Sequence, residues 1–370
     1  MLRSTLTLLT IVLFAINTHV ATAEQSGVID RLSLDLDLET YFDNRENANS
    51  EELRSRSGSD FALKLAPTIK YNFYGAHSIV GGVSWVIPFG DIGSGGGLLD
   101  DPYYNNLMPI VYYSIKDDRW SIAAGLFPHS ETMIGSYSTA FFADDYLFYD
   151  NVISGVMGRY SWQERSYVEM ICWWQSQPSN ETREIFSLLS SANVAIGGSL
   201  YAGYSFSLTH FAGSKAEGEN NVVDNALANP FIGFSHKGRW LFDMRAGVLV
   251  SMQRDRSYGN EWQMPVKGEV GFSLSRWGFT LDERFYYGDD LMPLYDGHPD
   301  LYYANTLYMG DPFFRADGVY NRAEINYQYK FANDIVGIDV GFVTHFYEGS
   351  LNTEQRLRLT IMLNMKRKYE

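Results

Sequence analysis

The sequence is poor in features that mark several other protein classes. It has one cysteine, Cys172, so the chain has no internal disulfide framework. Beyond residue 23 it has no apolar run approaching the roughly 20 residues of a membrane-spanning helix. Acidic residues outnumber basic ones by 44 to 29, which argues against nucleic acid as a partner. Because no Pro-rich linker or change in composition divides the chain, residues 24–370 are expected to form a single domain.

The patterns that carry catalysis or metal binding are also missing. The histidines do not have the spacing of a metal-binding helix, and no serine lies in a nucleophile elbow. The glycines of 93–97 lack the lysine of a phosphate-binding loop, and the aspartates of 289–300 are more typical of a solvated acidic loop than of a calcium site. The sequence therefore predicts no metal, no cofactor and no catalytic residue.

The first 23 residues have the three parts of an export signal. Arg3 supplies the positive end, residues 6–16 form the apolar centre, and Ala21-Thr22-Ala23 is a small-residue cleavage site. We expect a cleaved signal peptide over 1–23.

The most informative segment of the remaining chain is 31–42. Four leucines alternate there with polar residues: Leu32, Leu34, Leu36 and Leu38 with Ser33, Asp35, Asp37 and Glu39. In a strand, successive side chains point to opposite faces, so this segment has an apolar face and an acidic face. On a helix the same leucines would scatter around the axis. Strands with hydrocarbon on one side and water on the other show this alternation.

The same alternation recurs along the chain and predicts sixteen strands. Their ranges are 31–42, 61–73, 79–89, 108–116, 119–127, 152–162, 167–174, 184–196, 199–211, 228–236, 239–254, 264–274, 277–287, 320–330, 335–346 and 354–365. The connections alternate between short and long, as in barrels with tight periplasmic turns and larger outer loops. Aromatic residues recur near the short-turn ends, as expected for a girdle at the membrane boundary.

Over residues 31–365 the chain resembles the Gram-negative outer-membrane porins, in pattern and not in signature residues. The Pro-Glu-Phe-Gly-Gly motif is absent, and Tyr369 is followed by Glu370 where such barrels end in an aromatic residue. The resemblance implies an all-β, antiparallel, up-and-down transmembrane barrel in the outer membrane of a Gram-negative bacterium. It also implies contact with outer-membrane lipid and lipopolysaccharide and passage of small polar solutes, with a homo-oligomer as one option.

Strand parity predicts which charged residues line the lumen. They are Asp35, Asp37, Glu39, Lys64, Lys70, Asp243, Arg245, Lys267, Glu269, Asp282, Arg284, Arg322, Glu324, Asp339, Arg356 and Arg358. Acids and bases are nearly balanced, so no cationic ring of a strongly anion-selective pore is expected. The arginines lie on the later strands and face the acids of 31–42. This arrangement is consistent with a transverse field across a pore, or with ion pairs that block the lumen.

The third long loop, 128–150, is too apolar for a freely solvated segment. We expect it to fold into the lumen and narrow it, with its acids facing the arginines. The candidate constriction residues are Glu131, Phe141, Phe142, Asp144, Asp145 and Asp150. Alternatively, the loop packs across the top of the barrel or into a neighbouring subunit.

The sequence favours a porin-like channel for passive diffusion of small hydrophilic solutes, and not an enzyme. Two other functions stay open: a barrel enzyme that hydrolyses lipid or peptide, and a non-conducting structural or surface-binding barrel. Glu283 fits the pattern poorly because its parity points to lipid. A bulge, a subunit contact or a register error would explain it.

Overall fold

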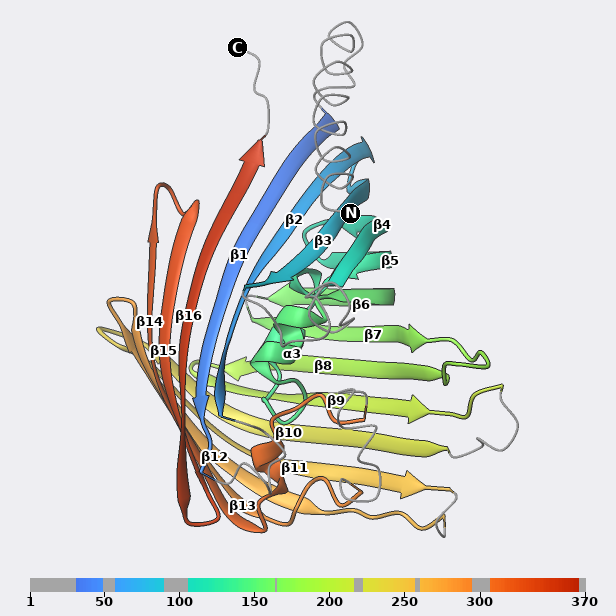
Figure 1. Cartoon of the computed structure of the whole chain (residues 1–370). Coiled ribbons are helices and arrows are strands. Elements are labelled where there is room, and N and C mark those ends of the chain that lie inside the picture. The colour runs from blue at the N-terminus through green and yellow to red at the C-terminus, as the bar shows by residue number, and fades with distance from the viewer. Residues whose placement is uncertain are drawn as a thin grey trace, which may run out of the picture.

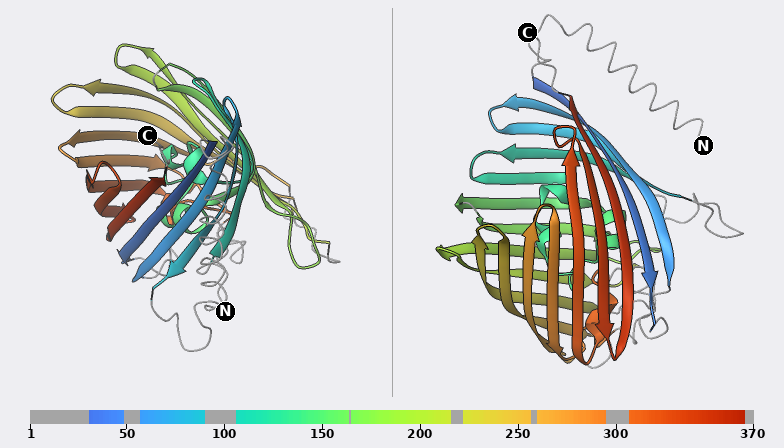
Figure 2. Two further views of the ribbon diagram at one scale, coloured as in Figure 1. Left: turned by 90° about the horizontal axis from the view of Figure 1, so that it is seen from above. Right: turned by 90° about the vertical axis from the view of Figure 1, so that its left-hand side faces the viewer.

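The computed structural model describes residues 31–48, 57–89, 106–163, 165–215, 222–256, 260–294 and 307–365. These residues form one closed antiparallel barrel in which each strand pairs with its neighbours in sequence, and β1 pairs with β16 (Figures 1 and 2). The predicted signal peptide and the segment 93–97 lie outside the described residues. Within the described residues, no helix is long and apolar enough to cross a membrane.

Sixteen strands make the barrel. Their bounds are β1 Leu32–Glu46, β2 Gly58–Tyr74, β3 His77–Pro88, β4 Asn106–Lys116, β5 Trp120–Pro128, β6 Val152–Gln163, β7 Ser166–Ser176, β8 Ile185–Gly197, β9 Leu200–Phe211, β10 Val223–Lys237, β11 Leu241–Asp255, β12 Val266–Arg276, β13 Phe279–Gly288, β14 Gly318–Phe331, β15 Val336–Tyr347 and β16 Ser350–Met365. The predicted fold class and every predicted strand are confirmed, including the segment 184–196.

Two turns differ from the prediction. The β12–β13 turn is Trp277-Gly278 and not Ser275-Arg276, so Trp277 lies in the turn and not on a strand. Glu348 and Gly349 form a two-residue turn between β15 and β16, although this connection lies at the long-loop end. In both turns the two central residues have positive φ, 55° and 86° in the first and 47° and 81° in the second. Such turns match the twist of a hairpin, so the strict alternation of short and long connections is wrong at this place.

The outer surface of the barrel carries the apolar face of each strand. On β11, Met244 and Val248 are exposed at even positions, whereas Leu249 and Ser251 at odd positions are buried. At the short-turn end Trp120 packs on Tyr160 with ring centroids 4.8 Å apart, as part of the expected girdle.

Glu283 does point outward, and the pairing of β13 with β14 shows no bulge or shift around it. The Asn321 amide on β14 donates a hydrogen bond to its carboxylate. Two of the three explanations considered for this residue, a bulge and a register error, are therefore wrong.

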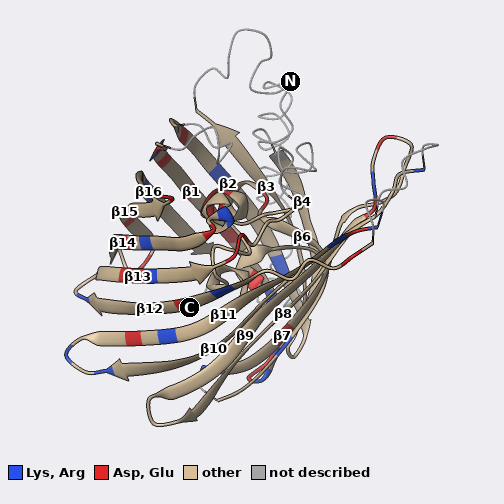
Figure 3. Cartoon of the chain, turned by 90° about the horizontal axis from the view of Figure 1, so that it is seen from below, with Lys and Arg blue, Asp and Glu red and all other residues tan. Residues whose placement is uncertain are grey.

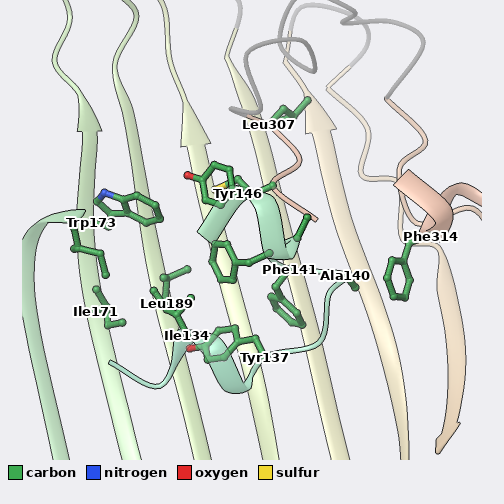
Figure 4. Packing of buried hydrophobic residues seen from close by; sticks show 14 of the residues in the cluster. Ile134, Tyr137, Ala140, Phe141, Tyr146, Ile171, Trp173, Leu189, Leu307 and Phe314 are labelled. Atoms are coloured by element: carbon green, nitrogen blue, oxygen red, sulfur yellow. The ribbon is translucent and has the colours of Figure 1, made fainter. Parts of the chain in front are cut away.

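The buried apolar cluster lies inside the barrel, where two long loops enter it. The loop after β5 contains the short 3-10 helices η3 (His129–Glu131) and η4 (Ile134–Ser136) and the helix α3 (Asp144–Tyr149). The loop before β14 contributes η5 (Pro312–Arg315). Figure 4 shows side chains of both loops in one buried cluster with those of β7 and β8: Ile134, Tyr137, Phe141, Tyr146, Leu307 and Phe314 belong to it together with Ile171, Trp173 and Leu189. Side chains of the two loops thus occupy part of the barrel interior.

Candidate functional site: the lumen and its inner loop

The inner face of the barrel has two unlike walls. Charged residues line the wall formed by β11–β16, β1 and β2, which we call the charged wall (Figure 3). The opposite wall, β3–β10, is lined mainly by serines and apolar side chains. Examples are Ser84, Ile110, Ser187, Leu189 and Thr209, all of them buried. This division follows from the sequence: alternate residues of a strand point inward, and the inward positions that carry charge are concentrated on β11–β16, β1 and β2.

On the charged wall, β11, β12 and β13 share one network. The Arg245 Nε donates to Glu269 Oε1 over 3.1 Å, and Arg284 Nη1 donates to the same oxygen over 3.3 Å. Arg284 also pairs with Asp282, with Nε 2.9 Å from Oδ1. The Glu269 side chain is fully buried, and the guanidiniums of Arg245 and Arg284 balance its negative charge inside the protein.

A second network joins β14 and β16. Arg356 Nη2 donates to Glu324 Oε1 over 2.5 Å, and Arg322 Nη2 lies 2.8 Å from Glu324 Oε2. Arg356 also forms an ion pair with Asp144 of the loop after β5, which contains η3, η4 and α3 and which we call the inner loop. Arg358 Nη2 lies 3.8 Å from Asp144 Oδ1. The loop helix α3 is therefore held against the charged wall by its first residue.

The inner loop has an apolar side and an acidic side. Phe141 and Phe142 are buried, 3% and 2% exposed, in the apolar cluster, which includes residues of β3–β11 and of β13–β15. On the other side Asp144 pairs with the arginines of β16, and Asp145 Oδ2 accepts from Arg45 Nη1 over 3.0 Å. Asp144 and Asp145 sit at the start of α3, where acids favour the positive helix end. The loop thus bridges the two walls.

The four acids of the loop do not share one partner surface. Asp144 and Asp145 face arginines, as described above. Glu131 lies at the opposite wall, where Tyr112 Oη donates to it over 3.2 Å and Lys116 Nζ lies 3.4 Å away. Asp150 accepts from Tyr146 Oη over 2.8 Å within the loop itself.

Burial and charge act in opposite directions on these loop carboxyls. Burial raises the pKa of Asp144, but Arg356 and Arg358 outweigh it and hold that pKa below its usual value. At Asp150, burial raises the pKa to about 6, and the Tyr146 hydrogen bond only partly opposes it. Asp144 is therefore ionised at neutral pH and able to hold the arginines.

The other predicted lining residues occupy separate places on the inner face. On β1 and β2, Lys64 pairs with Glu39 and Asn364 of β16 donates to Asp35, whereas Asp37 is exposed and Lys70 half-buried. On the later strands, Tyr201 Oη donates to Asp243 over 2.7 Å, and Asn326 and Gln328 donate to Asp339. Lys267 donates to the backbone carbonyls of Gly288 and Ala316. Lys267 thus anchors the last long loop and is fully buried. No group of three or more histidine, cysteine or acidic side chains in the described part could hold a metal ion.

Comparison with known proteins gives a fold and no closer relation. No protein-family model and no curated protein matches the sequence. Among solved structures, OpdK of Pseudomonas aeruginosa, crystallised with vanillate, is 10% identical, with a TM-score of 0.51 over 92% of this chain and 100% of that chain. OccK5 (OpdH) of the same organism is 11% identical, with a TM-score of 0.50 over the same shares. The fold is that of an outer-membrane porin. At this identity the likeness concerns the porin fold alone.

Several residues of the porin-fold lumen were missed by sequence reasoning. Asp43 and Arg45 extend the inward row of β1, and their side chains lie 2.7 Å apart. Glu354 and His345 lie on the inner faces of β16 and β15, with Glu354 Oε2 3.5 Å from His345 Nε2. Arg159 on β6 pairs with Glu169 over 3.2 Å. The same parity would have found them, but the predicted range for β1 ended at residue 42, before Asp43 and Arg45.

Proposed function

We propose that the chain is an outer-membrane channel for passive diffusion of small hydrophilic solutes. Barrels with about sixteen strands have room for an aqueous channel, whereas those with about eight are filled by side chains. The segregation of apolar residues outside and charged residues inside supports this proposal. So does the exposure of Asp37 within the lumen.

In this proposal the loop Pro128–Asp150 forms the constriction. The observation that carries it is the pairing of Asp144 with Arg356 and Arg358, which brings α3 onto the charged wall. Solutes then pass along a surface that offers both guanidinium and carboxylate groups, which orients polar molecules. Export by a cleaved signal at 1–23, residence in the outer membrane and the absence of enzymatic activity belong to the same proposal.

Single-channel recording tests both parts. Purified full-length protein in planar bilayers is expected to give discrete conductance steps, and deletion of 139–148 is expected to raise the step size because it removes part of the inner loop. A protein that inserts but passes no ions would reject the channel in favour of a blocked barrel. Equal conductance of the deletion variant and the parent would reject the constriction. Hydrolysis of phospholipid or peptide by the purified protein would favour an enzyme.

A further inference from the structure

A row of side chains crosses five neighbouring strands on the outer surface of the barrel. Direct cross-strand partners make it: Trp174 of β7 pairs with Phe186 of β8, Phe186 with His210 of β9, His210 with Asp224 of β10, and Asp224 with Arg254 of β11. Phe186 lies 5.7 Å from Trp174 and 5.0 Å from His210 between ring centroids. The row is therefore aromatic at one end and charged at the other.

The row faces the membrane side at the long-loop end. Arg254 shares the parity of Met244 and Val248, which are exposed on the outer surface of β11. Each member lies within two residues of the end of its strand, at the end where the long loops leave. Aromatic residues at such positions mark the boundary between hydrocarbon and headgroups. The charged end of the row is thus placed at headgroup level in the outer leaflet.

Asp224 organises the charged end. Its Oδ2 accepts from Arg254 Nη2 at 2.6 Å and from Arg256 Nε at 2.9 Å, and its Oδ1 accepts from Arg256 Nη2 at 3.1 Å. His210 Nδ1 lies 2.9 Å from Oδ1. A guanidinium carries five N–H bonds on three nitrogens. Each of the two arginines uses its Nε and Nη2 nitrogens to donate to Asp224. Arg254 and Arg256 together carry two positive charges against the one negative charge of Asp224, so the three side chains have a net positive charge. The Nη1 groups of both arginines make no hydrogen bond to Asp224.

The surroundings favour a membrane ligand over a soluble one. The Arg254 guanidinium carbon lies 4.4 Å over the ring of Trp262, which is itself 48% exposed, and the side chain of Arg256 is 45% exposed. Guanidinium groups suit phosphate because they bind it through paired hydrogen bonds. Basic clusters beside membrane-embedded segments recognise anionic headgroups.

We propose that Arg254 and Arg256, fixed by Asp224, bind a phosphate of an outer-leaflet lipid, with lipopolysaccharide as the source. Trp174, Phe186 and Trp262 then border the acyl chains or sugars next to that phosphate. The site rests on the outer-membrane placement proposed above, but it does not depend on an open lumen.

The test counts lipid retained by the purified full-length protein. Native mass spectrometry after incubation with phosphorylated lipopolysaccharide is expected to show bound lipid, about tenfold more than for R254Q/R256Q, since charge-assisted hydrogen bonds are lost. Arg276→Gln is the matched control, because Arg276 stacks on Trp277 at the short-turn end, 3.6 Å from the ring centroid.

Several results would overturn the site. Equal retention by the parent and R254Q/R256Q would do so, as would equal retention of lipopolysaccharide stripped of phosphate. Binding of inorganic phosphate without preference for the lipid would assign the site to a free anion. A dimer that forms only when both arginines are present would assign it to a second copy. Conductance of R254Q/R256Q is expected to be unchanged, so loss of the lipid and loss of the channel are separate outcomes.

Discussion

Arg356, on the inner face of β16, connects the inner loop to two strands of the barrel. Its side chain is 9% exposed and contacts three carboxylates, on α3, β14 and β16: Asp144, Glu324 and Glu354. Removing one partner of a buried ion network leaves the others uncompensated, which costs more than the loss of a surface pair. The position of the inner loop therefore depends on this guanidinium.

Arg356→Gln is expected to weaken the docking of α3 by about 3 kcal/mol, because Asp144 and Glu324 lose their shared cation. Hydrogen exchange of residues 144–150 measures this loosening, and the single-channel conductance is expected to rise with it. Lys70→Gln, on the same wall in β2, is the control and should leave the hydrogen exchange of residues 144–150 unchanged. Unchanged exchange in Arg356→Gln would show that the apolar side of the loop holds it alone.

At the scale of elements, the inner loop and the loop before β14 support each other. The Ala143 amide donates to the Met309 carbonyl over 2.7 Å, and the Asp311 amide donates to the Thr139 carbonyl over 2.8 Å. Burial, reinforced by the charge of Glu354, raises the pKa of Asp311 to about 7. The neutral form of this carboxyl is therefore the one that the docked loop favours.

This pKa sets the direction of a pH effect on the loop. A folded-state pKa above the unfolded value gives stability that is full at pH below about 4 and lost as the pH rises through about 7. Amide protection factors of 307–317 are thus expected to fall by up to roughly a hundredfold between pH 5 and pH 8, since the unfolded state binds almost one proton fewer than the folded state over most of this range. Asp311→Asn removes the titration and should keep protection constant over this range. Parallel pH profiles for the parent and Asp311→Asn would contradict the assignment.

At the scale of the whole molecule, the barrel has an apolar outer face and a polar inner face. Leu38 and Asp37 are neighbours on β1, with Leu38 on the outer face and Asp37 exposed inside. An arginine on the lipid face near the middle of a barrel costs about 2–4 kcal/mol, whereas lumen positions tolerate charge.

Leu38→Arg is accordingly expected to lower the free energy of unfolding in vesicles by about 2–4 kcal/mol, and Asp37→Arg to change it by less than about 1 kcal/mol. Reversible urea unfolding followed by tryptophan fluorescence measures both. Similar losses for the two variants would mean that the outer face of β1 does not meet hydrocarbon.

The local pattern of the chain determined the strands, their count and which face each side chain takes. This was predictable because side chains alternate between the two faces of a strand with a period of two, and the strands of this barrel have one apolar face and one polar face. Parity placed residues such as Arg245 and Glu324 on the inner face for the same reason. The alternation does not fix where a strand ends. The predicted first strand therefore stopped before Asp43 and Arg45, and the turn at Trp277-Gly278 was placed two residues too early.

Only the tertiary structure decided which of these residues meet. Asp144 and Arg356 are separated by 212 positions, and their pairing depends on how the loop enters the barrel. That path is set by packing of Phe141 and Phe142 against distant strands, which no local period encodes. The outer row from Trp174 to Arg254 likewise requires the register of five strands. Contacts across a closed cylinder arise from its closure, and closure is a property of all sixteen strands together.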